Sequence, residues 1–405
     1  MTAPPLVLVE PNLHQLGGHR HRTLAALAAA HGSALVVAPY GVAGETRDAL
    51  EAARAQVSAP TGAVPAVLAS AATAAAALAR MARRAFASRC WPSALRRLPH
   101  QVTLVARCLT ECACVRTGRR LAGGTATVVV LTASEALHGA AGVLGGPHIR
   151  FVHEVVTTED AVLRRLGRLA RRGQRRVLVL APTDAVRGEL VARFPHLPVR
   201  ARPFAVADPD DRLIDSERRT ARAVWKIPAT EAAVCLVGGW WPYKDHEVLE
   251  AALARLEAPL HLLVAGAPLD PDRLQRWAGL PEVCLHLLPG PVAEDTVRAV
   301  YAAADATVVA RRPGVGKESG LVVDAVRLGV PLIISEHDPA LTKSLAGQAW
   351  VRTFPPGDSA GLAGLLRDLS WSPLPRPTAA AAAELGVPSA AEQIAFLTSS
   401  FKELL

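Results

Sequence analysis

ATVVARRPGVGKESGLVVDAVRLGVPLIIS, residues 306–335, contains the pattern that determines the fold. Short apolar runs at 306–310 and 331–335 are typical of buried strands, and a helix is expected over 321–328 between them. A strand, a helix and a second strand in succession predict a parallel βαβ unit with a right-handed crossover.

The same alternation extends through both halves of the chain. In the first half, apolar runs predict strands at 6–10, 35–38, 127–131, 149–153, 177–180 and 199–204. In the second half they predict strands at 233–237, 261–265, 283–287, 306–310 and 331–335. Alternating strands and helices form doubly wound sheets, and ligands gather at the carboxyl ends of their strands. The predicted fold class is α/β, with two Rossmann-like domains whose parallel sheets face each other across a cleft.

Length and polarity divide the chain into domains. At 405 residues it is too long for one ordinary domain, and the charged segment at 208–222 interrupts the alternation. We expect an N-terminal domain at 1–207, a linker at 208–222 and a C-terminal domain at 223–375. The final helices, at 376–405, are expected to return to the N-terminal domain.

The net charge of +9 is concentrated in two arginine-rich stretches. No acidic residue occurs between Glu51 and Glu111, where six of these arginines lie. The two groups are Arg80, Arg83, Arg84, Arg89, Arg96 and Arg97, and Arg164, Arg165, Arg168, Arg171, Arg172, Arg175 and Arg176. Such patches attract an anionic membrane or a phosphorylated acceptor, unless they are simply solvated. Nucleic acid is not an expected partner, because aromatic residues make up only 4% of the chain and no reading module is present.

Neither secretion nor a membrane span is expected. The first residues, MTAPPLVLVEPN, lack the basic region and cleavage pattern of a signal peptide, so a cytoplasmic protein is expected, with peripheral membrane contact left open. The Ala-rich stretch 63–81 comes nearest to a bilayer span, but Pro65, Ser70 and Thr73 are expected to interrupt it.

Cysteines and paired aspartates raise the question of a metal. Cys108, Cys112 and Cys114 are close in sequence, but structural zinc takes four ligands and no fourth is evident, so buried reduced thiols are expected. Two Asp-Pro-Asp triplets, 208–210 and 270–272, are expected to mark turns. No metal and no cofactor are therefore predicted.

Two glycine-containing loops follow the first strand of each half. Gly17 and Gly18 precede the first helix, where glycines let backbone N–H groups approach an anion closely. The loop GGWWPYK, residues 238–244, ends in Lys244, which can place a cation against a diphosphate. A tight turn and a surface lysine are the alternative interpretations.

The densest cluster of polar groups is RRPGVGKESG, residues 311–320. Its glycines and Ser319 precede a helix, so N–H donors converge there beside two arginines and a lysine. A phosphate site is predicted, and Glu318 and Asp324 are the nearby carboxylates suited to sugar or ribose hydroxyls. The alternative is a charged surface loop with Ser319 as an ordinary N-cap.

The order of these motifs resembles the retaining glycosyltransferases of family 4, which have the GT-B fold. The matching set is Gly17-Gly18, His153-Glu154 at a strand end, Lys244, and Ser319-Gly320 before a helix that ends in Gly329-Val330-Pro331. Segments 264–268, 305–309 and 356–358, the last followed by Leu362, match the family pattern as well. The resemblance covers nearly all of the second half, but only the strand ends in the first.

The resemblance implies a donor site held mainly by the C-terminal domain. Lys244 would contact the donor diphosphate, and the backbone from Ser319 to Leu321 would bind its phosphates. Gly18 would approach the donor from the N-terminal, acceptor-binding domain, and His153 would touch the donor sugar near its anomeric carbon. In this chemistry the leaving phosphate helps to deprotonate the acceptor, so the protein positions the substrates and stabilises developing charge without a metal.

Two features depart from the family pattern. The family has two glutamates separated by seven residues, whereas Glu318 and Asp324 are separated by five. Alignment on the end of the helix places Asp324 at the ribose-binding glutamate and leaves Glu318 out of register with the sugar-binding one. Gly239 or Trp241 also stands where the family has an arginine, so Arg311 or Arg312 would have to replace it.

The sequence therefore predicts a glycosyltransferase that moves a sugar from a nucleotide diphosphate sugar to an unidentified hydroxyl acceptor, with retention of configuration. The residues predicted to bind the donor or to act in catalysis are Gly17, Gly18, His153, Lys244, Arg311, Glu318, Ser319, Gly320, Leu321 and Asp324. A sugar-nucleotide epimerase and a non-catalytic partner protein that has lost its donor site are the alternatives.

Overall fold

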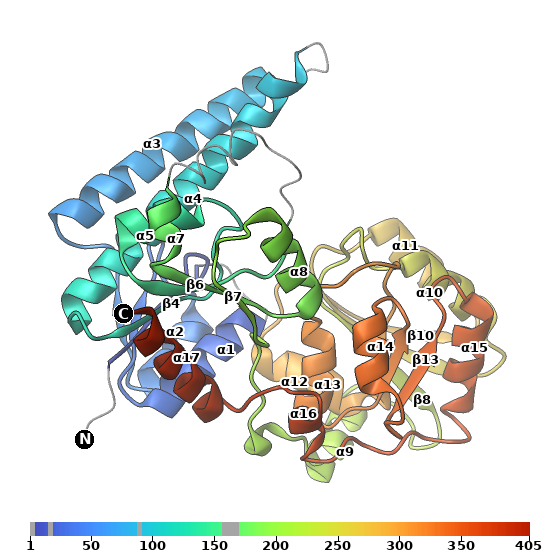
Figure 1. Ribbon diagram of the computed structural model, residues 1–405. Coiled ribbons are helices and arrows are strands. Elements are labelled where there is room, and N and C mark those ends of the chain that lie inside the picture. The colour runs from blue at the N-terminus through green and yellow to red at the C-terminus, as the bar shows by residue number, and fades with distance from the viewer. Residues whose placement is uncertain (1–4, 15–18, 87–90, 156–169) are drawn as a thin grey trace. The chain divides into compact units, whose positions relative to one another are not determined.

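The computed structural model describes residues 5–14, 19–86, 91–155 and 170–405, and the chain divides into two compact units (Figure 1). The first unit contains the first strand, residues 20–204 and the last helix, and the second contains residues 205–389. Each unit has one fully parallel sheet covered by helices, as the alternation in the sequence predicts.

Seven strands form the sheet of the first unit, in the order β3-β2-β1-β4-β5-β6-β7. Their bounds are β1 Leu6–Val9, β2 Leu35–Val37, β3 Gln56–Ser58, β4 Thr127–Val130, β5 His148–Phe151, β6 Val177–Ala181 and β7 Val199–Ala201. The chain adds strands outward from β1 on one side and from β4 on the other, so the loops after β1 and β4 diverge. Strand β3 was not predicted, because its side chains are exposed or half-buried and form no apolar run.

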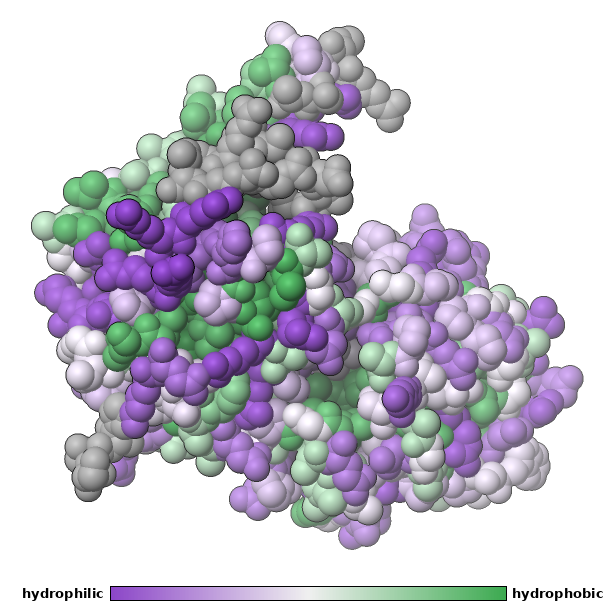
Figure 2. All heavy atoms as spheres, in the orientation of Figure 1, coloured by the Kyte–Doolittle hydropathy of each residue, from purple (hydrophilic) through white to green (hydrophobic). Residues whose placement is uncertain are grey.

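The helices of the first unit include a long antiparallel pair, α3 and α4, whose members lie side by side (Figure 1). The helix bounds are α1 His19–His31, α2 Gly44–Ala52, α3 Ala63–Ala85, α4 Ser93–Ala122, α5 His138–Gly145, α7 Arg171–Gln174, α8 Asp184–Arg193 and α17 Ala390–Leu404. Figure 2 shows hydrophobic side chains gathered along the α3–α4 pair. Helix α17 belongs to the first unit although its sequence follows the second.

Pro65, Ser70 and Thr73, which were expected to interrupt the Ala-rich stretch as a bilayer span, do not interrupt its helix. Helix α3 is continuous over its 23 residues, and Pro65 lies in its first turn, where the missing N–H has no helical acceptor anyway. Thr73 stays in the helix because its hydroxyl donates to the Ala69 carbonyl at 3.0 Å. By length and composition alone, α3 qualifies as a membrane span, and only 17% of its most apolar window is buried.

Three cysteines expected to be reduced and buried lie inside the first unit on α4. Cys108 and Cys112 are one turn apart, and their thiols approach the Leu137 and Ala141 carbonyls at 4.0 and 3.9 Å. Burial raises the pKa of the Cys114 thiol, so it stays protonated. The prediction of buried, unpaired thiols is confirmed at these three positions.

Six strands form the sheet of the second unit, in the order β10-β9-β8-β11-β12-β13. Their bounds are β8 Ala232–Val237, β9 Leu260–Gly266, β10 Val283–Pro289, β11 Ala306–Val309, β12 Leu332–Ser335 and β13 Val351–Phe354. Strand β13 was not predicted, because only its first and last residues are buried and the two between them are polar. The order reverses at β8 and β11, so the loops that follow these two strands diverge and leave room between them.

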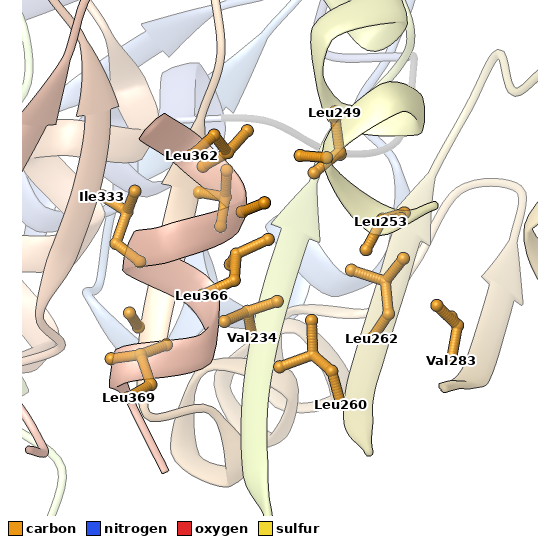
Figure 3. Close-up of a cluster of buried hydrophobic side chains, with 14 of the residues drawn as sticks. Val234, Leu249, Leu253, Leu260, Leu262, Val283, Ile333, Leu362, Leu366 and Leu369 are labelled. Atoms are coloured by element: carbon orange, nitrogen blue, oxygen red, sulfur yellow. The ribbon is translucent and has the colours of Figure 1, made fainter. Parts of the chain in front are cut away.

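The second unit is covered by helices that begin at recognisable caps. Their bounds are α9 Asp215–Val224, α10 His246–Leu253, α11 Pro271–Ala278, α12 Glu294–Ala303, α13 Gly320–Leu328, α14 Pro339–Leu345, α15 Ser359–Asp368 and α16 Ala381–Glu384, with a 3₁₀ turn, η1, at Pro209–Asp211. Asp270 accepts from the Arg273 N–H and Pro271 follows it, so the triplet at 270–272 begins α11. Figure 3 shows the core of this unit, where leucines of α15 face side chains of β8, β9 and α10.

Residues 208–222, where the sequence places a linker, contain η1 and part of α9 and belong to the second unit. Arg218 and Arg222 form ion pairs with the Asp305 carboxylate, the latter at 3.1 Å, and the Ala233 N–H donates to the same carboxylate at 2.8 Å. The charges of this segment thus fix α9 to the start of β8 and β11.

Candidate functional site

The loops after β8 and β11 meet at the carboxyl ends of the second sheet. Lys244 and Arg311 form an isolated antiparallel bridge between the two loops. The Asp245 N–H donates to the Ala310 carbonyl at 3.0 Å, and the Arg312 N–H donates to the Tyr243 carbonyl at 2.9 Å. The loops 238–244 and 311–320, which the sequence indicated as two separate candidate sites, are therefore joined through their backbones into one cationic site.

Lys244 points into this site rather than into solvent. Its ammonium group donates to the carbonyls of Val237 and Gly238, at 3.1 and 3.3 Å. Burial, and secondarily the Arg311 guanidinium, lower the pKa of Lys244 to about 8. Among the described residues, this half-buried ammonium group is held by carbonyl oxygens, so it is poised to gain an anionic partner.

The glycine loop before Lys244 allows a close approach of two backbones. A Cβ atom on Gly239 would lie 2.2 Å from the Ala267 carbonyl oxygen, so only glycine fits there. An arginine at this position would displace the neighbouring loop. Of the two positions where the resemblance implies an arginine, Gly239 and Trp241, the backbone excludes one at Gly239.

Arg311 is the second buried cation of the site, with 4% of its surface exposed. One of its terminal nitrogens donates to the Lys317 carbonyl at 3.3 Å, while its Nε has no hydrogen-bond partner among the described residues. The guanidinium lies 5.4 Å from the centre of the Tyr243 ring, and the Lys317 ammonium lies 3.9 Å from it. Burial lowers the pKa of Arg311. Tyr243 therefore organises both cations through its ring.

Helix α13 begins directly after this cationic loop. Ser319 is its N-cap residue and is buried, and its hydroxyl has no hydrogen-bond partner in the described part of the chain. The first N–H groups of a helix have no partner within it and carry a partial positive charge. The backbone N–H groups of Gly320 and Leu321, the Ser319 hydroxyl and Arg311 Nε are thus the donors that the described part of the chain leaves available.

A small pocket connects these groups. It is lined by side chains from the β8 and β11 loops and from α13, among them Val237, Trp240, Lys244, His246, Arg311 and Leu321. His246 stacks on Trp240 with ring centroids 4.4 Å apart, and burial lowers the pKa of His246 to about 3, so its ring is neutral. The pocket places Lys244 and Arg311 on the same cavity as the first turn of α13.

The two carboxylates nominated near this loop have different surroundings. Glu318 is half-buried and directly precedes the N-cap of α13. Asp324 is buried within α13, where it accepts from the Tyr301 hydroxyl at 3.2 Å and pairs with Arg327 at 3.6 Å. The structure thus brings Lys244, Arg311, Ser319, Gly320 and Leu321 together, and ties Asp324 to the neighbouring helix α12.

His153 lies in the first unit, just after β5. Its Nε2 is 2.9 Å from the Leu131 carbonyl oxygen, which requires that this nitrogen carries the proton. Burial lowers the pKa of His153 to about 4, so the ring is neutral at physiological pH. It also packs edge-on against Phe204, with ring centroids 4.4 Å apart. Gly17 and Gly18 lie outside the described residues.

Sequence analysis missed a buried carboxylate at the same edge of the first sheet. Glu10 follows β1 and accepts from the Thr132 hydroxyl at 2.7 Å and from the Asn12 N–H at 2.9 Å. Its second oxygen is buried without a hydrogen-bond partner among the described residues, and burial raises its pKa. The polar residue that ends an otherwise apolar strand was the available signal. Ser335 was also missed: its hydroxyl accepts from the Arg311 N–H at 2.9 Å and fixes the cationic loop.

Two doubly wound parallel α/β units of seven and six strands define the class of fold, which is the GT-B fold. No protein-family model and no curated protein matches the sequence. Solved structures do match at low identity. HepE of Anabaena, in complex with UDP and glucose, is 16% identical with a TM-score of 0.61, and the match covers 97% of this chain and 99% of that one.

Two further GT-B structures match over nearly their whole lengths. A glycosyltransferase from Rickettsia africae is 12% identical with a TM-score of 0.61, covering 100% of this chain and 99% of that one. WaaG, a glycosyltransferase involved in lipopolysaccharide biosynthesis, is 14% identical with a TM-score of 0.51, covering 99% and 98%. At these identities the likeness establishes the fold.

Proposed function

We propose that the chain is a glycosyltransferase that moves a sugar from a nucleotide diphosphate sugar to a hydroxyl group. The observation that carries the proposal is the convergence of Lys244, Arg311 and the first turn of α13 on one pocket. An ammonium group, a guanidinium group and helix N–H groups are the donors that neutralise a diphosphate. The solved structures of HepE with UDP and with UDP-glucose support a nucleotide sugar as the ligand of this fold.

In this proposal the diphosphate bridges the two loops of the second unit. Lys244 binds one phosphate, and Arg311 takes the place of the arginine that Gly239 excludes. The backbone N–H groups of Gly320 and Leu321 and the Ser319 hydroxyl bind the other phosphate, since this hydroxyl is buried without a partner in the described structure. The Lys244 and Arg311 charges are already desolvated, so their attraction to phosphate is stronger than that of exposed cations.

Three other residues predicted from the sequence, Asp324, Glu318 and His153, bind the ribose or the donor sugar in this proposal. Asp324 binds the ribose in this proposal, through the carboxylate that accepts from the Tyr301 hydroxyl and pairs with Arg327. Glu318 contacts the donor sugar, as a carboxylate at the start of α13 would. His153 contacts the donor sugar as a neutral ring, because its pKa of about 4 keeps it uncharged.

We further propose that transfer proceeds with retention and without a metal. The bond from the anomeric carbon to the diphosphate breaks, the acceptor oxygen bonds to the same face, and the acceptor proton passes to the leaving phosphate oxygen. No strong base is needed in this scheme, which agrees with a neutral His153. The protein's contribution is to hold the phosphate charge that develops as the bond breaks.

Calorimetric titration with UDP-, GDP-, ADP- and TDP-sugars tests the donor assignment. The native chain and the Lys343→Ala control, which removes an exposed lysine of the same unit, should bind one nucleotide class equally. Lys244→Ala should bind it at least about tenfold more weakly, since a charged hydrogen bond contributes roughly 1.5–3 kcal/mol. Equal affinities for all three proteins, or no binding to any, would contradict the proposal.

Two outcomes would point to other functions. A new nucleotide sugar formed without acceptor, detected by NMR, would indicate an epimerase. Tight donor binding with neither transfer nor epimerisation across a panel of acceptors would indicate a non-catalytic partner protein. The anomeric coupling constant of a transferred sugar decides between retention and inversion, and activity in the presence of a strong chelator tests metal independence.

We also propose that the tip of the α3–α4 pair rests on an anionic membrane, which places the reaction at the cytoplasmic side of that membrane. Met81 is 67% exposed and Trp91 is 43% exposed, and Phe86 packs edge-on against Trp91. Exposed arginines surround these side chains: Arg80, Arg83, Arg84, Arg96 and Arg97. Aromatic and aliphatic side chains next to arginines suit the interface between lipid headgroups and acyl chains.

Co-sedimentation with vesicles of neutral and acidic lipid, at two salt concentrations, tests the membrane contact. The native chain should bind acidic vesicles at low salt and lose most of that binding at high salt. The double variant Met81→Asp/Trp91→Asp should not bind. Val224→Asp, which changes an exposed valine of the second unit, should bind as the native chain does. Binding that is unchanged in the double variant would contradict the assignment.

A further inference from the structure

A histidine and cysteine cluster lies at the opposite end of the second sheet from the proposed nucleotide site. His261 is the second residue of β9, and Cys284 and His286 lie on the edge strand β10. Cys284 is the register partner of His261 across the parallel pair, and Ala233 of β8 is its partner on the other side. Register partners and residues two apart share one face of a sheet, so these side chains and that of Glu231, two residues before Ala233, lie on the same face.

The potential ligand atoms of this cluster point at one another. His261 Nδ1 lies 2.8 Å from His286 Nε2, and the two rings are stacked with centroids 5.2 Å apart. The ligand atoms of His261, His286 and Cys284 all lie within 4.8 Å of each other. His261 Nε2 lies 2.7 Å from a carboxylate oxygen of Glu231.

The Glu231 carboxylate determines which nitrogen of His261 is available. The Glu231 carboxylate accepts a hydrogen bond from the Nε2–H group of His261, so Nδ1 carries a lone pair that is directed at His286. Without a metal, the Nε2–H group of His286 donates a hydrogen bond to this Nδ1 lone pair of His261. A carboxylate behind a ligating histidine is the arrangement that orients imidazole ligands in zinc proteins.

We propose that His261, His286 and Cys284 bind a zinc ion, with Glu231 orienting His261. Two imidazole nitrogens and a thiolate favour zinc over magnesium or calcium, which require oxygen ligands. Zinc–nitrogen bonds of about 2.0–2.1 Å in a tetrahedral site require the two nitrogens to move apart by about half an ångström. Cys284 is exposed on the edge strand, so water can supply the fourth ligand.

The protonation states of the cluster suit metal binding at neutral pH. Burial, and secondarily His261, lower the pKa of His286, and a lower pKa reduces the competition of protons with a metal ion. On binding, the His286 proton moves from Nε2 to Nδ1, and the Cys284 thiol releases one proton as it becomes a thiolate. The ion links β9 to the edge strand β10 at the amino-terminal ends of the strands, far along the sheet from Lys244, so it stabilises this edge and takes no part in sugar transfer.

Metal titration of the chelator-treated full-length protein tests the site. Zinc should bind with a stoichiometry of one, raise the Tm and release about one proton, measured by calorimetry in buffers of different ionisation enthalpy. Cobalt in place of zinc should show the thiolate charge-transfer absorption and the strong visible bands of a tetrahedral site. Glu231→Gln should weaken zinc binding by about 10–100-fold, as loss of such an orienting group does elsewhere.

Matched variants separate this site from adventitious binding. Cys284→Ser should retain the fold but abolish the cobalt–thiolate absorption, and His286→Ala should abolish the zinc-dependent rise in Tm. His196→Ala, which removes an exposed histidine of the first unit, should behave as the native chain in every measurement. Zinc affinity that is equal in the native chain, Cys284→Ser and His286→Ala would overturn the proposal and leave the cluster as a hydrogen-bond chain from Glu231 to His286. Because the readouts are metal binding and stability, they do not depend on the proposed sugar transfer.

Discussion

The carboxyl ends of the two sheets carry opposite kinds of chemistry. In the second unit, the half-buried Lys244, the buried Arg311 and the N-terminus of α13 line one pocket. In the first unit, the corresponding edge carries a neutral histidine, His153, and a buried carboxyl group, Glu10, with a raised pKa. One edge favours an anion, and the other offers hydrogen-bonding side chains that suit hydroxyl groups.

This difference teaches that a shared topology does not determine the site. Both sheets reverse their strand order and so leave diverging loops at one edge. What differs is the composition of those loops: glycines and cations after β8 and β11, and polar side chains with no net positive charge after β1, β4 and β5. We therefore assign nucleotide binding to the second unit and contacts with sugar or acceptor hydroxyl groups to the first.

The largest effect is expected when both cations at the carboxyl edge of the second sheet are removed. The double variant Lys244→Ala/Arg311→Ala should bind the nucleotide at least about 100-fold more weakly, because two charged hydrogen bonds to phosphate are removed. Calorimetry measures the change, and circular dichroism checks that the fold is retained. An affinity within threefold of the native value would show that the phosphates bind elsewhere.

Changes to Glu10 and His153, at the carboxyl edge of the first sheet, should affect transfer and leave nucleotide binding unchanged. Glu10→Gln keeps an oxygen that can accept from Thr132 and Asn12, and His153→Phe keeps the contact with Phe204. Each should lower kcat for transfer by about 10–100-fold, as loss of a positioning group does. The dissociation constant for the free nucleotide should stay within about twofold. A large loss of nucleotide affinity in either variant would contradict the assignment of nucleotide binding to the second unit.

The pH dependence of nucleotide binding should reflect Lys244. Its pKa of about 8 lies below its ordinary value, so a fraction of the ammonium group loses its charge between pH 7 and 9 in the free protein. Affinity should therefore fall by up to about tenfold as the pH rises through this range. The matched control is Lys244→Ala, whose affinity should be nearly constant between pH 7 and 9. A native profile that is equally flat would contradict the assigned charge.

The smallest expected effect concerns Asp324. Asp324→Asn keeps an acceptor for the Tyr301 hydroxyl but loses the ion pair with Arg327, so the free energy of unfolding should fall by about 1 kcal/mol. Chemical denaturation measures this loss. Nucleoside affinity should fall only a few-fold, because an amide oxygen still accepts from one ribose hydroxyl. A loss of nucleotide affinity comparable to that of Lys244→Ala would give Asp324 a larger role than the present account does.

The sequence predicted what depends on local pattern. Apolar runs identified the buried strands, but β3 and β13 lack such runs, since their middle or outer residues face solvent. The lysine and glycine loops were recognised by residue type and position. The bridge between Lys244 and Arg311 was not predicted, because it depends on which strands are neighbours in the sheet.

Contacts between strands account for the rest of what was missed. Ser335 reaches Arg311 from the neighbouring strand β12, and His261 meets Cys284 and His286 only because β9 and β10 pair in one particular register. Cys108, Cys112 and Cys114 are close in sequence and drew attention as possible metal ligands, whereas helix α11 separates residue 261 from residues 284 and 286. Residue spacing in the sequence thus indicates thiols on one helix, but it cannot indicate a cluster such as residues 261, 284 and 286, which depends on the pairing of two strands.

A structure of the chain with UDP bound tests the central claim most directly. The account predicts that the diphosphate oxygens lie within hydrogen-bond distance of Lys244 Nζ and of the backbone nitrogens of Gly320 and Leu321. A diphosphate bound anywhere else, with Lys244 still donating only to the Val237 and Gly238 carbonyls, would contradict it.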